Sequence, residues 1–297
     1  MQGIIIESIS NLYKIAVEEP KKQIYEATAR GKFKKEEISP VVGDVVEIEI
    51  VDEEKKTAVI NKIEERKVYV KRPKLANITQ IVFVVSSKDP KPDLLMLDKQ
   101  LVFAEFLGIK AIIVLNKTDL DKDKQFMHIK EVYEKVGYTV IETEAKSQKG
   151  VEELKQALTG NINAFSGNSG VGKSTLINAI FNTDVTQEGE ISKKNKRGKN
   201  TTTAIKLYEI DNNTYIADTP GFSTFDISEI ESKDLDQYFK EFKENIENCE
   251  FVGCTHIKEE NCGIKEAISN GNITEERYKR FCKIYEELKE KESRKKW

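Results

Sequence analysis

Residues 167–174 read Gly-Asn-Ser-Gly-Val-Gly-Lys-Ser, and this stretch decides the fold. It fits G-x-x-x-x-G-K-[ST], in which glycines let the backbone curl so that its N–H groups surround a phosphate. An apolar run at residues 162–165 precedes the stretch, and residues 175–180 follow it with helical character. A chance glycine-rich turn would not need a strand before it and a helix after it. The pattern therefore predicts a phosphate loop at a helix N-terminus.

Two side chains of the loop have specific roles in such sites. The amine of Lys173 is predicted to reach the β- and γ-phosphates, and the hydroxyl of Ser174 is predicted to bind Mg²⁺. The predicted nucleotide-binding residues of the loop are Gly167, Asn168, Ser169, Gly170, Val171, Gly172, Lys173 and Ser174.

A second motif follows a buried strand. Residues 78–86 and 111–115 are near-continuous apolar runs, as expected for parallel strands covered on both faces. The second run ends in Asn116-Lys117-Thr118-Asp119, which fits the guanine-reading pattern N-K-x-D. The carboxylate of Asp119 can accept hydrogen bonds from guanine N1–H and the 2-amino group, whereas adenine offers no such pair. Such a tetrapeptide alone is often a surface turn. Beside a phosphate loop it predicts GTP and conflicts with an ATPase or kinase.

A further contact to the base is predicted at residues 144–146. These residues read Glu-Ala-Lys and follow a predicted strand at residues 138–141, where GTPases usually carry Ser-Ala-Lys. The backbone N–H of Ala145 would meet guanine O6, because this contact does not depend on the preceding side chain.

Two segments complete the GTPase pattern. Residues 190–203 are rich in Lys, Asn and Gly, so we expect a mobile switch that ends in three threonines, of which Thr202 is our choice for Mg²⁺ and the γ-phosphate. Its basic residues are interpreted as RNA-phosphate contacts, with a solvated loop as the alternative. Residues 218–221 fit D-x-x-G: Asp218 would hold Mg²⁺ through water, and the Gly221 N–H would sense the γ-phosphate. The predicted catalytic residues are Lys173, Thr202 and Gly221.

The residue after this motif is Phe222, where Ras-like enzymes place a water-orienting glutamine. A phenyl ring cannot orient water by hydrogen bonding. We therefore expect slow hydrolysis by the isolated protein, with the missing group supplied from elsewhere in the chain or by a partner.

The order of the motifs is shuffled relative to Ras-like GTPases. N-K-x-D comes first, and the phosphate loop, the threonines and D-x-x-G follow it. The same sheet can be built from this order if its ends are joined and the chain is opened just before residue 78. The sequence therefore predicts a circularly permuted GTPase domain, with the C-terminal residues attached directly to the second switch.

The first 68 residues contain five short runs with strand character, several of them alternating apolar and polar residues. They predict a small closed barrel such as an OB-fold. Oligonucleotide binding and a role as a spacer or protein contact are both open at this point. Several aromatic and basic residues could form a surface that stacks on bases and binds phosphates, or equally a core edge beside a solvated loop. They are Tyr13, Tyr25, Arg30, Lys32, Phe33, Lys34 and Lys35.

The C-terminal residues carry a metal-ligand pattern. The spacing Cys249-x4-Cys254-x-His256-x5-Cys262 supplies three thiolates and one imidazole, a closed set suited to structural Zn²⁺, with buried free cysteines as the alternative. Few apolar positions surround it, so we expect the metal to supply much of the stability. Cys282 is predicted to be core in a helix over residues 275–291. The basic side chains of this helix could contact RNA or acidic neighbours, or could be solvated. They are Arg277, Lys279, Arg280 and Lys283.

The amino-acid composition limits the kinds of partner that we expect. The chain has 297 residues and a formal net charge of −3. Proteins that hold nucleic acid by counterion release are usually basic overall, so a DNA-binding role is not predicted, and an RNA partner must be met by local patches or shape. The cysteines favour a metal in a reducing compartment. Without a signal peptide or an apolar run of membrane length, we expect a cytoplasmic protein. Nothing suggests more than a monomer.

The sequence resembles the bacterial ribosome small-subunit-dependent GTPase A family. The resemblance rests on the permuted motif order, the phosphate loop, the metal-ligand pattern, Lys-Asn-Thr-Thr-Thr at 199–203 and Asp-Thr-Pro-Gly-Phe at 218–222. The resemblance implies an OB-fold at 1–68, a permuted GTPase domain at 69–227 and a helical zinc domain at 228–297. It implies that Thr175 joins the nucleotide-binding loop. One departure is Asn200, where many relatives carry a histidine.

The resemblance also implies a function. The family binds the 30S ribosomal subunit and its 16S rRNA in the GTP form, acts late in 30S maturation and is stimulated by the 30S particle. The alternative is a GTP-dependent ribosome-binding clamp in which hydrolysis only resets binding. Either way, the implied ligands are GTP or GDP, Mg²⁺ and one structural Zn²⁺.

Overall fold

The computed structural model describes residues 1–19, 21–31, 33, 38–71, 73–122, 124–182, 205–211, 213–218 and 227–295. The chain divides into two compact units, each assembled from segments that are separate in the sequence. Unit 1 comprises Met1–Val82, Ala145–Ser166 and Lys173–Phe222, and unit 2 comprises Phe83–Glu144, Gly167–Gly172 and Ser223–Trp297. No helix of the described residues has the length and hydropathy needed to cross a bilayer.

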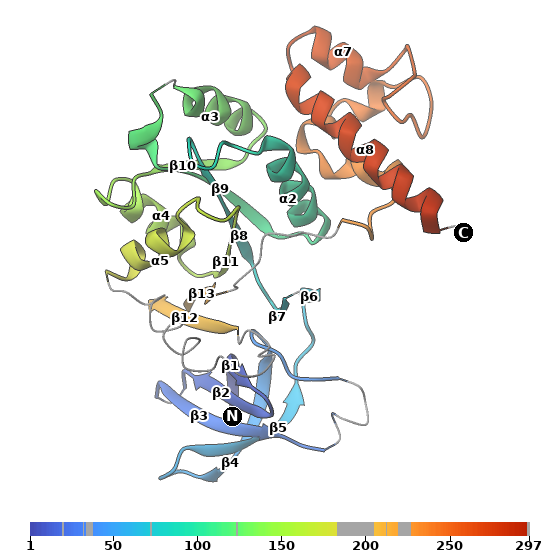
Figure 1. Cartoon of the computed structure of the whole chain (residues 1–297). Helices are drawn as coiled ribbons and strands as arrows, with labels where there is room; N and C mark the ends of the chain where they lie inside the picture. Colours follow the sequence, from blue (N-terminus) through green and yellow to red (C-terminus); the bar gives the residue numbers. More distant parts are fainter. Residues whose placement is uncertain are drawn as a thin grey trace. The chain divides into compact units, whose positions relative to one another are not determined.

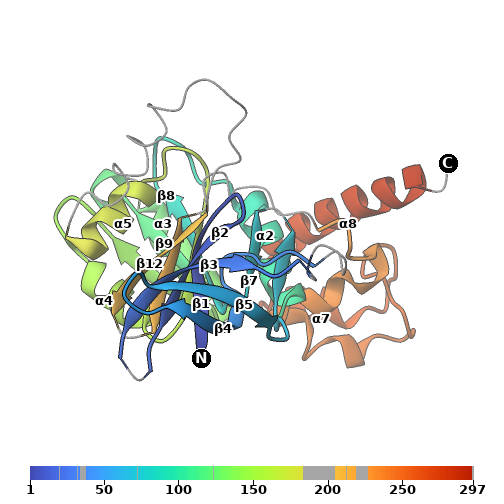
Figure 2. The same ribbon diagram turned by 90° about the horizontal axis from the view of Figure 1, so that it is seen from below.

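Unit 1 begins with a closed barrel of five strands, blue in Figures 1 and 2. Its strand order is β1-β2-β3-β5-β4, and β4 pairs back onto β1 to close it. Each strand points alternate apolar side chains inward, so Ile5, Ile15 and Ile60 are fully buried. The strands are β1 (Gln2–Ile9), β2 (Leu12–Val17), β3 (Gln23–Ala29), β4 (Val45–Asp52) and β5 (Thr57–Ile63).

The barrel's aromatic residues do not form the stacking surface that we considered from the sequence. Tyr13, Tyr25 and Phe33 are 5%, 1% and 6% exposed, so they belong to the core. Tyr13 and Tyr25 lie at inward-facing positions of β2 and β3. Arg30 is exposed and donates a 2.6 Å hydrogen bond to Glu49. The remaining candidates, Lys32, Lys34 and Lys35, lie outside the described residues.

The rest of unit 1 carries the second half of the predicted GTPase sheet. Its strand order is β8-β11-β13-β12, and β12 pairs with β1, so the sheet continues into the barrel. Buried Asn163 accepts from Gln80 Nε2 at 2.8 Å and donates to Tyr215 O at 3.0 Å, which ties three of these strands together. The elements are β6 (Tyr69–Lys71), β7 (Lys74–Ala76), β8 (Gln80–Ser86), α4 (Val151–Leu158), β11 (Ile162–Ser166), α5 (Lys173–Phe181), β12 (Lys206–Asp211) and β13 (Thr214–Asp218).

Unit 2 contains the last four residues of β8, followed by the helices and strands that carry the N-K-x-D motif. The strand order is β10-β9-β8, and β9 and β10 run parallel. The Asp93 side chain caps helix α2 by accepting a 2.9 Å hydrogen bond from Met96 N. The elements are α2 (Leu94–Phe106), β9 (Lys110–Asn116), η1 (Thr118–Leu120), α3 (Gln125–Lys135) and β10 (Thr139–Thr143).

We call residues 227–295, also in unit 2, the C-terminal module (orange to red in Figure 1). Contrary to the expectation of few apolar contacts, it has an aromatic core. The rings of Phe239, Phe242 and Phe281 lie 4.8–5.2 Å apart by centroid and are all nearly inaccessible. The module consists of η2 (Ser232–Tyr238), η3 (Lys240–Phe242), η4 (Ile246–Asn248), α7 (Gly263–Ser269) and α8 (Glu275–Lys295).

Helix α8 is attached to α2 by a buried ion cluster, which we call the Asp98 clamp. The carboxylate of Asp98 pairs with Arg280, accepts from Arg277 Nη1 at 2.5 Å and accepts from the Tyr133 hydroxyl at 2.7 Å. Arg277 is 2% exposed and also pairs with Glu241. Burial opposes the charged guanidinium, but Asp98 and Glu241 outweigh burial and raise the pKa of Arg277.

The clamp resolves the open interpretation of the basic residues of α8. Arg277 and Arg280 meet acidic neighbours, so the RNA interpretation is wrong for buried Arg277. Lys279 is exposed and pairs at 2.9 Å with Glu275 of its own helix, and Lys283 is exposed. The prediction of a core position was wrong for Cys282, which is only half-buried.

Candidate nucleotide site and metal centre

The phosphate loop needs its glycines for two reasons. Gly167, Gly170 and Gly172 have φ angles of +145°, +84° and +98°, a region that residues with a Cβ rarely adopt. A Cβ on Gly167 would also lie 2.3 Å from the carbonyl oxygen of Val84, and one on Gly172 would lie 2.5 Å from Asn116 Nδ2. The loop is therefore packed closely against the end of β8 and against the N-K-x-D motif.

Two side chains of the N-K-x-D motif hold the loop directly. Asn116 is 2% exposed, donates from Nδ2 to Val171 O at 2.9 Å and accepts from Thr143 Oγ1 at 3.0 Å. The Lys117 amine donates to the carbonyl oxygens of Gly170 and Asp89, both at 2.7 Å. Segments about fifty residues apart in the sequence thus form one site within unit 2.

Asp119 behaves differently from its two neighbours. It lies in η1 and is exposed, because Lys117 adopts a left-handed conformation with φ +64° and turns the chain out of β9. Asn116 and Lys117 thus brace the loop, and the Asp119 carboxylate is exposed to solvent. Contact of Asn116, Lys117 and Asp119 with guanine stays a prediction.

Sequence reasoning missed the residues that support this bracing. Thr143 at the end of β10 orients the Asn116 amide, and the Ser87 hydroxyl donates to Lys117 O at 3.0 Å. Asp89 contributes a carbonyl oxygen from the segment between β8 and α2. All three follow or end strands at their carboxyl ends, where ligand sites of α/β sheets gather, and that position is the signal that could have found them.

The remaining predicted nucleotide residues belong to unit 1. Lys173 begins α5 and is half-buried, and burial lowers the pKa of its amine. Ser174 and Thr175 are exposed in the first turn of that helix, where partial positive charge gathers. Ala145 is 9% exposed, and Asp218 ends β13. Thr202, Gly221 and the basic switch lie outside the described residues, and the joint use of Asp119 and Lys173 by one nucleotide stays a prediction.

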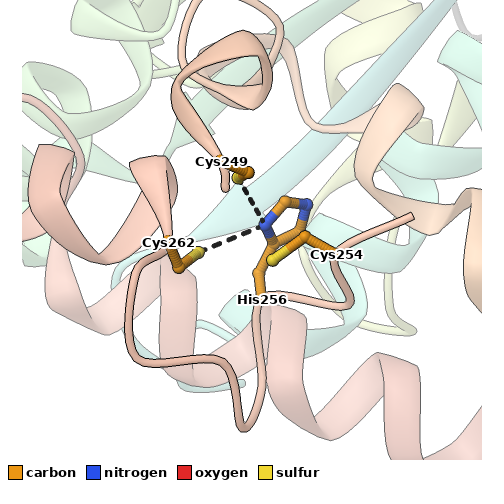
Figure 3. A group of neighbouring side chains, drawn as sticks. All are labelled: Cys249, Cys254, His256 and Cys262. Atoms are coloured by element: carbon orange, nitrogen blue, oxygen red, sulfur yellow. Dashed lines mark hydrogen bonds between the residues drawn. The ribbon is translucent and has the colours of Figure 1, made fainter. Parts of the chain in front are cut away.

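The four residues of the metal-ligand pattern converge in the C-terminal module (Figure 3). One ligand atom from each of Cys249, Cys254, His256 and Cys262 lies within 4.8 Å of all the others. His256, Cys262 and Cys254 are 1%, 4% and 8% exposed. Burial raises the pKa of the Cys254 thiol to about 12, with a further contribution from neighbouring thiols. Three crowded thiolates at a buried site are costly without a cation, so the donor set fits a thiophilic metal such as zinc.

A carboxylate shapes the loop between the ligands. Glu259 accepts hydrogen bonds of 2.9–3.1 Å from the Thr255 N–H and hydroxyl and from the N–H groups of Ile257 and Lys258. Burial opposes the charged carboxylate, but these bonds prevail and lower the pKa of Glu259 to about 2. The Tyr278 hydroxyl donates to His256 O at 2.6 Å. Neither residue belongs to the metal-ligand pattern, so the spacing gave no signal of them.

Comparisons with known proteins agree with this geometry. The family model of the RsgA GTPase matches residues 63–228, and that of the RsgA N-terminal domain matches residues 2–60. The small ribosomal subunit biogenesis GTPase RsgA of Ruminiclostridium cellulolyticum is 40% identical over 288 residues, which cover 97% of this chain and 94% of the relative. The protein of the same name from Caldanaerobacter subterraneus subsp. tengcongensis is 39% identical over 294 residues, covering 99% and 98%.

Solved structures show the same fold. YjeQ from Thermotoga maritima superposes with a TM-score of 0.83 at 36% identity, covering 97% of this chain and 98% of that one. YloQ, described as a circularly permuted GTPase, gives a TM-score of 0.82 at 28% identity, covering 98% and 95%. The permuted fold and the resemblance inferred from the motifs are thereby confirmed, and the chain belongs to the RsgA GTPase family of GTP hydrolases.

Proposed function

We propose that this GTPase acts late in the maturation of the small ribosomal subunit, binding the 30S particle and its 16S rRNA in the GTP form. The support is the name shared by its relatives, small ribosomal subunit biogenesis GTPase. The observation that carries the nucleotide chemistry is the bracing of the phosphate loop by Asn116 and Lys117. That contact supports the proposal that the N-K-x-D motif and the phosphate loop serve the same nucleotide.

Each predicted residue has a defined part in this proposal. The Asp119 carboxylate accepts from guanine N1–H and the 2-amino group, and the Ala145 N–H meets O6. The loop residues 167–175 surround the phosphates, with the Lys173 amine on the β- and γ-phosphates. The Gly221 N–H senses the γ-phosphate. The Mg²⁺-binding residues are Ser174, Thr202 and Asp218. When bound, Mg²⁺ neutralises charge on the phosphate oxygens.

We infer a stimulating partner because the second switch lacks the glutamine that orients the attacking water in Ras-like enzymes. Phe222 cannot orient a water molecule, and Asn200 stands where many relatives carry a histidine. We infer that the isolated chain turns over slowly and that the 30S particle completes the site. The protein is then a cytoplasmic monomer with domains at 1–68, 69–227 and 228–297, and Cys249, Cys254, His256 and Cys262 hold one structural Zn²⁺.

The decisive experiment is the rate of GTP hydrolysis with and without purified 30S subunits. We expect a large increase with 30S and loss of hydrolysis in Lys173→Ala, with a non-ribosomal RNA of similar size as the control. An unchanged rate would remove the ribosomal role and leave a GTPase with another partner. If non-hydrolysable GTP supports both 30S binding and full maturation, the alternative of a clamp that hydrolysis only resets is correct.

The base-reading role of Asp119 has its own test. Xanthine carries a carbonyl where guanine carries the 2-amino group, so an amide at position 119 can donate to it. Asp119→Asn should weaken GTP binding and improve xanthosine triphosphate binding, measured by titration with both nucleotides. The control is Asp121→Asn, two residues further along the chain. Equal weakening for both nucleotides would contradict base reading by Asp119.

A further inference from the structure

The two nitrogens of the His256 ring face different chemistry. Nδ1 lies 3.3 Å from Cys262 Sγ and 3.6 Å from Cys249 Sγ, and Figure 3 shows this nitrogen facing the sulfurs. Nε2 lies 3.2 Å from Oδ2 of Asp236, a residue of η2. The ring therefore presents one nitrogen to the thiols and the other to a carboxylate.

This arrangement restricts the position of the ring proton. A histidine that binds a metal uses an unprotonated nitrogen, so a neutral ring carries its proton on the other nitrogen. With Nδ1 as the ligand atom, Nε2–H donates to the Asp236 carboxylate. With Nε2 as the ligand atom, the metal would leave the thiol cluster for the Asp236 side of the ring. Only the first arrangement agrees with the distances, because Nδ1 is the nitrogen beside the sulfurs of Cys262 and Cys249 and Nε2 is the nitrogen beside Asp236.

We propose that His256 binds zinc through Nδ1 and that Asp236 is the positioning residue that fixes this tautomer. The inference rests on the zinc site of the proposed function. Metal-binding histidines commonly donate their second N–H to a carboxylate, which orients the ring and raises its basicity.

Other neighbours hold the ring without selecting a nitrogen. The Tyr278 hydroxyl fixes the backbone oxygen of His256, whose φ is +62°. The rings of Phe242 and Phe281 flank the imidazole at centroid distances of 5.9 and 6.3 Å. These contacts restrict the plane of the ring, but a phenyl ring distinguishes poorly between the two nitrogens. Among the described residues, Asp236 is the group whose hydrogen bond requires the proton at Nε2.

The contact also attaches η2 to the metal centre. At its first residue, η2 is held by the Ser232 hydroxyl, which donates to Glu292 at 2.9 Å. At its last residue, the Tyr238 ring packs on Phe106 of α2 at 5.6 Å. Asp236 provides the attachment between them. Loss of this attachment should therefore loosen η2, which makes hydrogen exchange of residues 232–238 a readout independent of GTP hydrolysis.

The first test is zinc affinity by competition with a chelator on the full chain. Asp236→Ala should weaken zinc binding about 10- to 100-fold, the range seen when such carboxylates are removed. Asp236→Asn should lose less, because its amide oxygen can still accept from Nε2–H. Asp234→Ala, in the same 3₁₀-helix and without contact to His256, is the matched control. Equal zinc affinity of the wild type and Asp236→Ala would overturn the proposal.

The second test reads the tautomer directly. The chain has two histidines, so the zinc-loaded variant His128→Gln gives a single imidazole in a ¹⁵N-correlated NMR spectrum. We expect a protonated Nε2 and a metal-bound Nδ1, and faster hydrogen exchange of residues 232–238 in Asp236→Ala. A metal-bound Nε2 would overturn the inference while leaving the zinc site intact. Failure of the wild-type chain to bind zinc at all would instead overturn the proposed zinc site, and the inference with it.

Discussion

The barrel at residues 2–63 and the C-terminal module at residues 227–295 are of comparable length, yet their interiors are built differently. The barrel buries alternate aliphatic residues of five strands that close on themselves, so each strand supports two neighbours. The module has short 3₁₀-helices and two α-helices around a few aromatic rings, four metal-ligand residues and a buried ion cluster.

The difference concerns how stability is distributed. In the barrel, each buried apolar side chain contributes a small part of the free energy of folding. A single substitution therefore removes only a small part of the stability. In the module, a few polar groups each affect the free energy of unfolding strongly. A buried charge or thiolate that loses its partner destabilises the folded state. Loss of the metal or of a buried charge partner should therefore have a large local effect in the module, whereas single deletions in the barrel should each have a small effect.

Metal removal should give the largest effect. Zinc binding supplies an apparent free energy of about 10–16 kcal/mol in isolated zinc-finger peptides. This exceeds the net contribution of about 1 kcal/mol that each hydrogen bond within the loop over residues 249–262 makes. A chelator should abolish hydrogen-exchange protection in this loop and leave β1–β5 protected, as measured by mass spectrometry. Cys262→Ser should reproduce the result, and Cys282→Ser is the control. Protection retained throughout the loop after zinc loss would show that the aromatic core alone holds it.

The Asp98 clamp should give the next largest effect. Asp98→Ala leaves two guanidinium groups without their shared carboxylate, so we expect a loss of about 3–5 kcal/mol in the stability of unit 2, as for other broken buried ion pairs. Denaturant unfolding followed by hydrogen exchange in α8 measures it. Lys279→Ala breaks an exposed pair on the same helix and should cost less than about 0.5 kcal/mol. Similar costs for the two variants would mean that burial of the clamp is unimportant.

A single deletion in the barrel should give a smaller effect. Ile60 is fully buried, so Ile60→Val removes one methyl group and should cost about 1 kcal/mol of unfolding free energy. The denaturant midpoint of the barrel should shift while zinc affinity stays constant. Val51→Ala, at an exposed position of β4, should leave the midpoint unchanged. A loss of several kcal/mol from Ile60→Val would contradict the small effect expected of single deletions in the barrel.

The smallest effect should come from the carboxylate of the metal loop. The pKa of Glu259 is lowered to about 2, so its contribution is complete above the unfolded-state value near 4.5 and is lost as the pH falls toward 2. After allowance for solvent screening, Glu259→Gln should lower the stability of the module by about 0.5 kcal/mol at pH 7. The difference between wild type and variant, measured across pH, cancels the acid release of metal common to both. A difference that grows on acidification would contradict the sign.

Local structure was predicted well from the sequence where an apolar run or a capping residue determines the element directly. The apolar run at 78–86 became β8 (Gln80–Ser86), and the strand before the loop became β11. Helix α2 begins where Asp93 supplies its cap. Elements with weak patterns were missed. Helix α3 starts after a left-handed residue, Lys124, whose side chain does not cap it, and β12 is a six-residue strand between β1 and β13.

Side-chain partners were predicted less well than elements. Alternation correctly placed Tyr25 in a strand but could not decide between the core and a binding face. Helical spacing placed Arg277 on α8 but gave no sign of Asp98, 179 residues away. The metal-ligand spacing identified His256 but not Asp236, because a single hydrogen bond between distant residues leaves no periodic trace in a sequence.

The sequence by itself identified the motifs, their permuted order and the four residues that converge as a candidate metal centre, because each motif consists of residues that are close along the chain. The tertiary structure alone decided that Asn116 and Lys117 brace the loop, that Arg277 is buried against Asp98 and that His256 faces Asp236. These contacts arise only after the backbone has folded, when buried polar groups must find partners among whatever the fold has placed beside them.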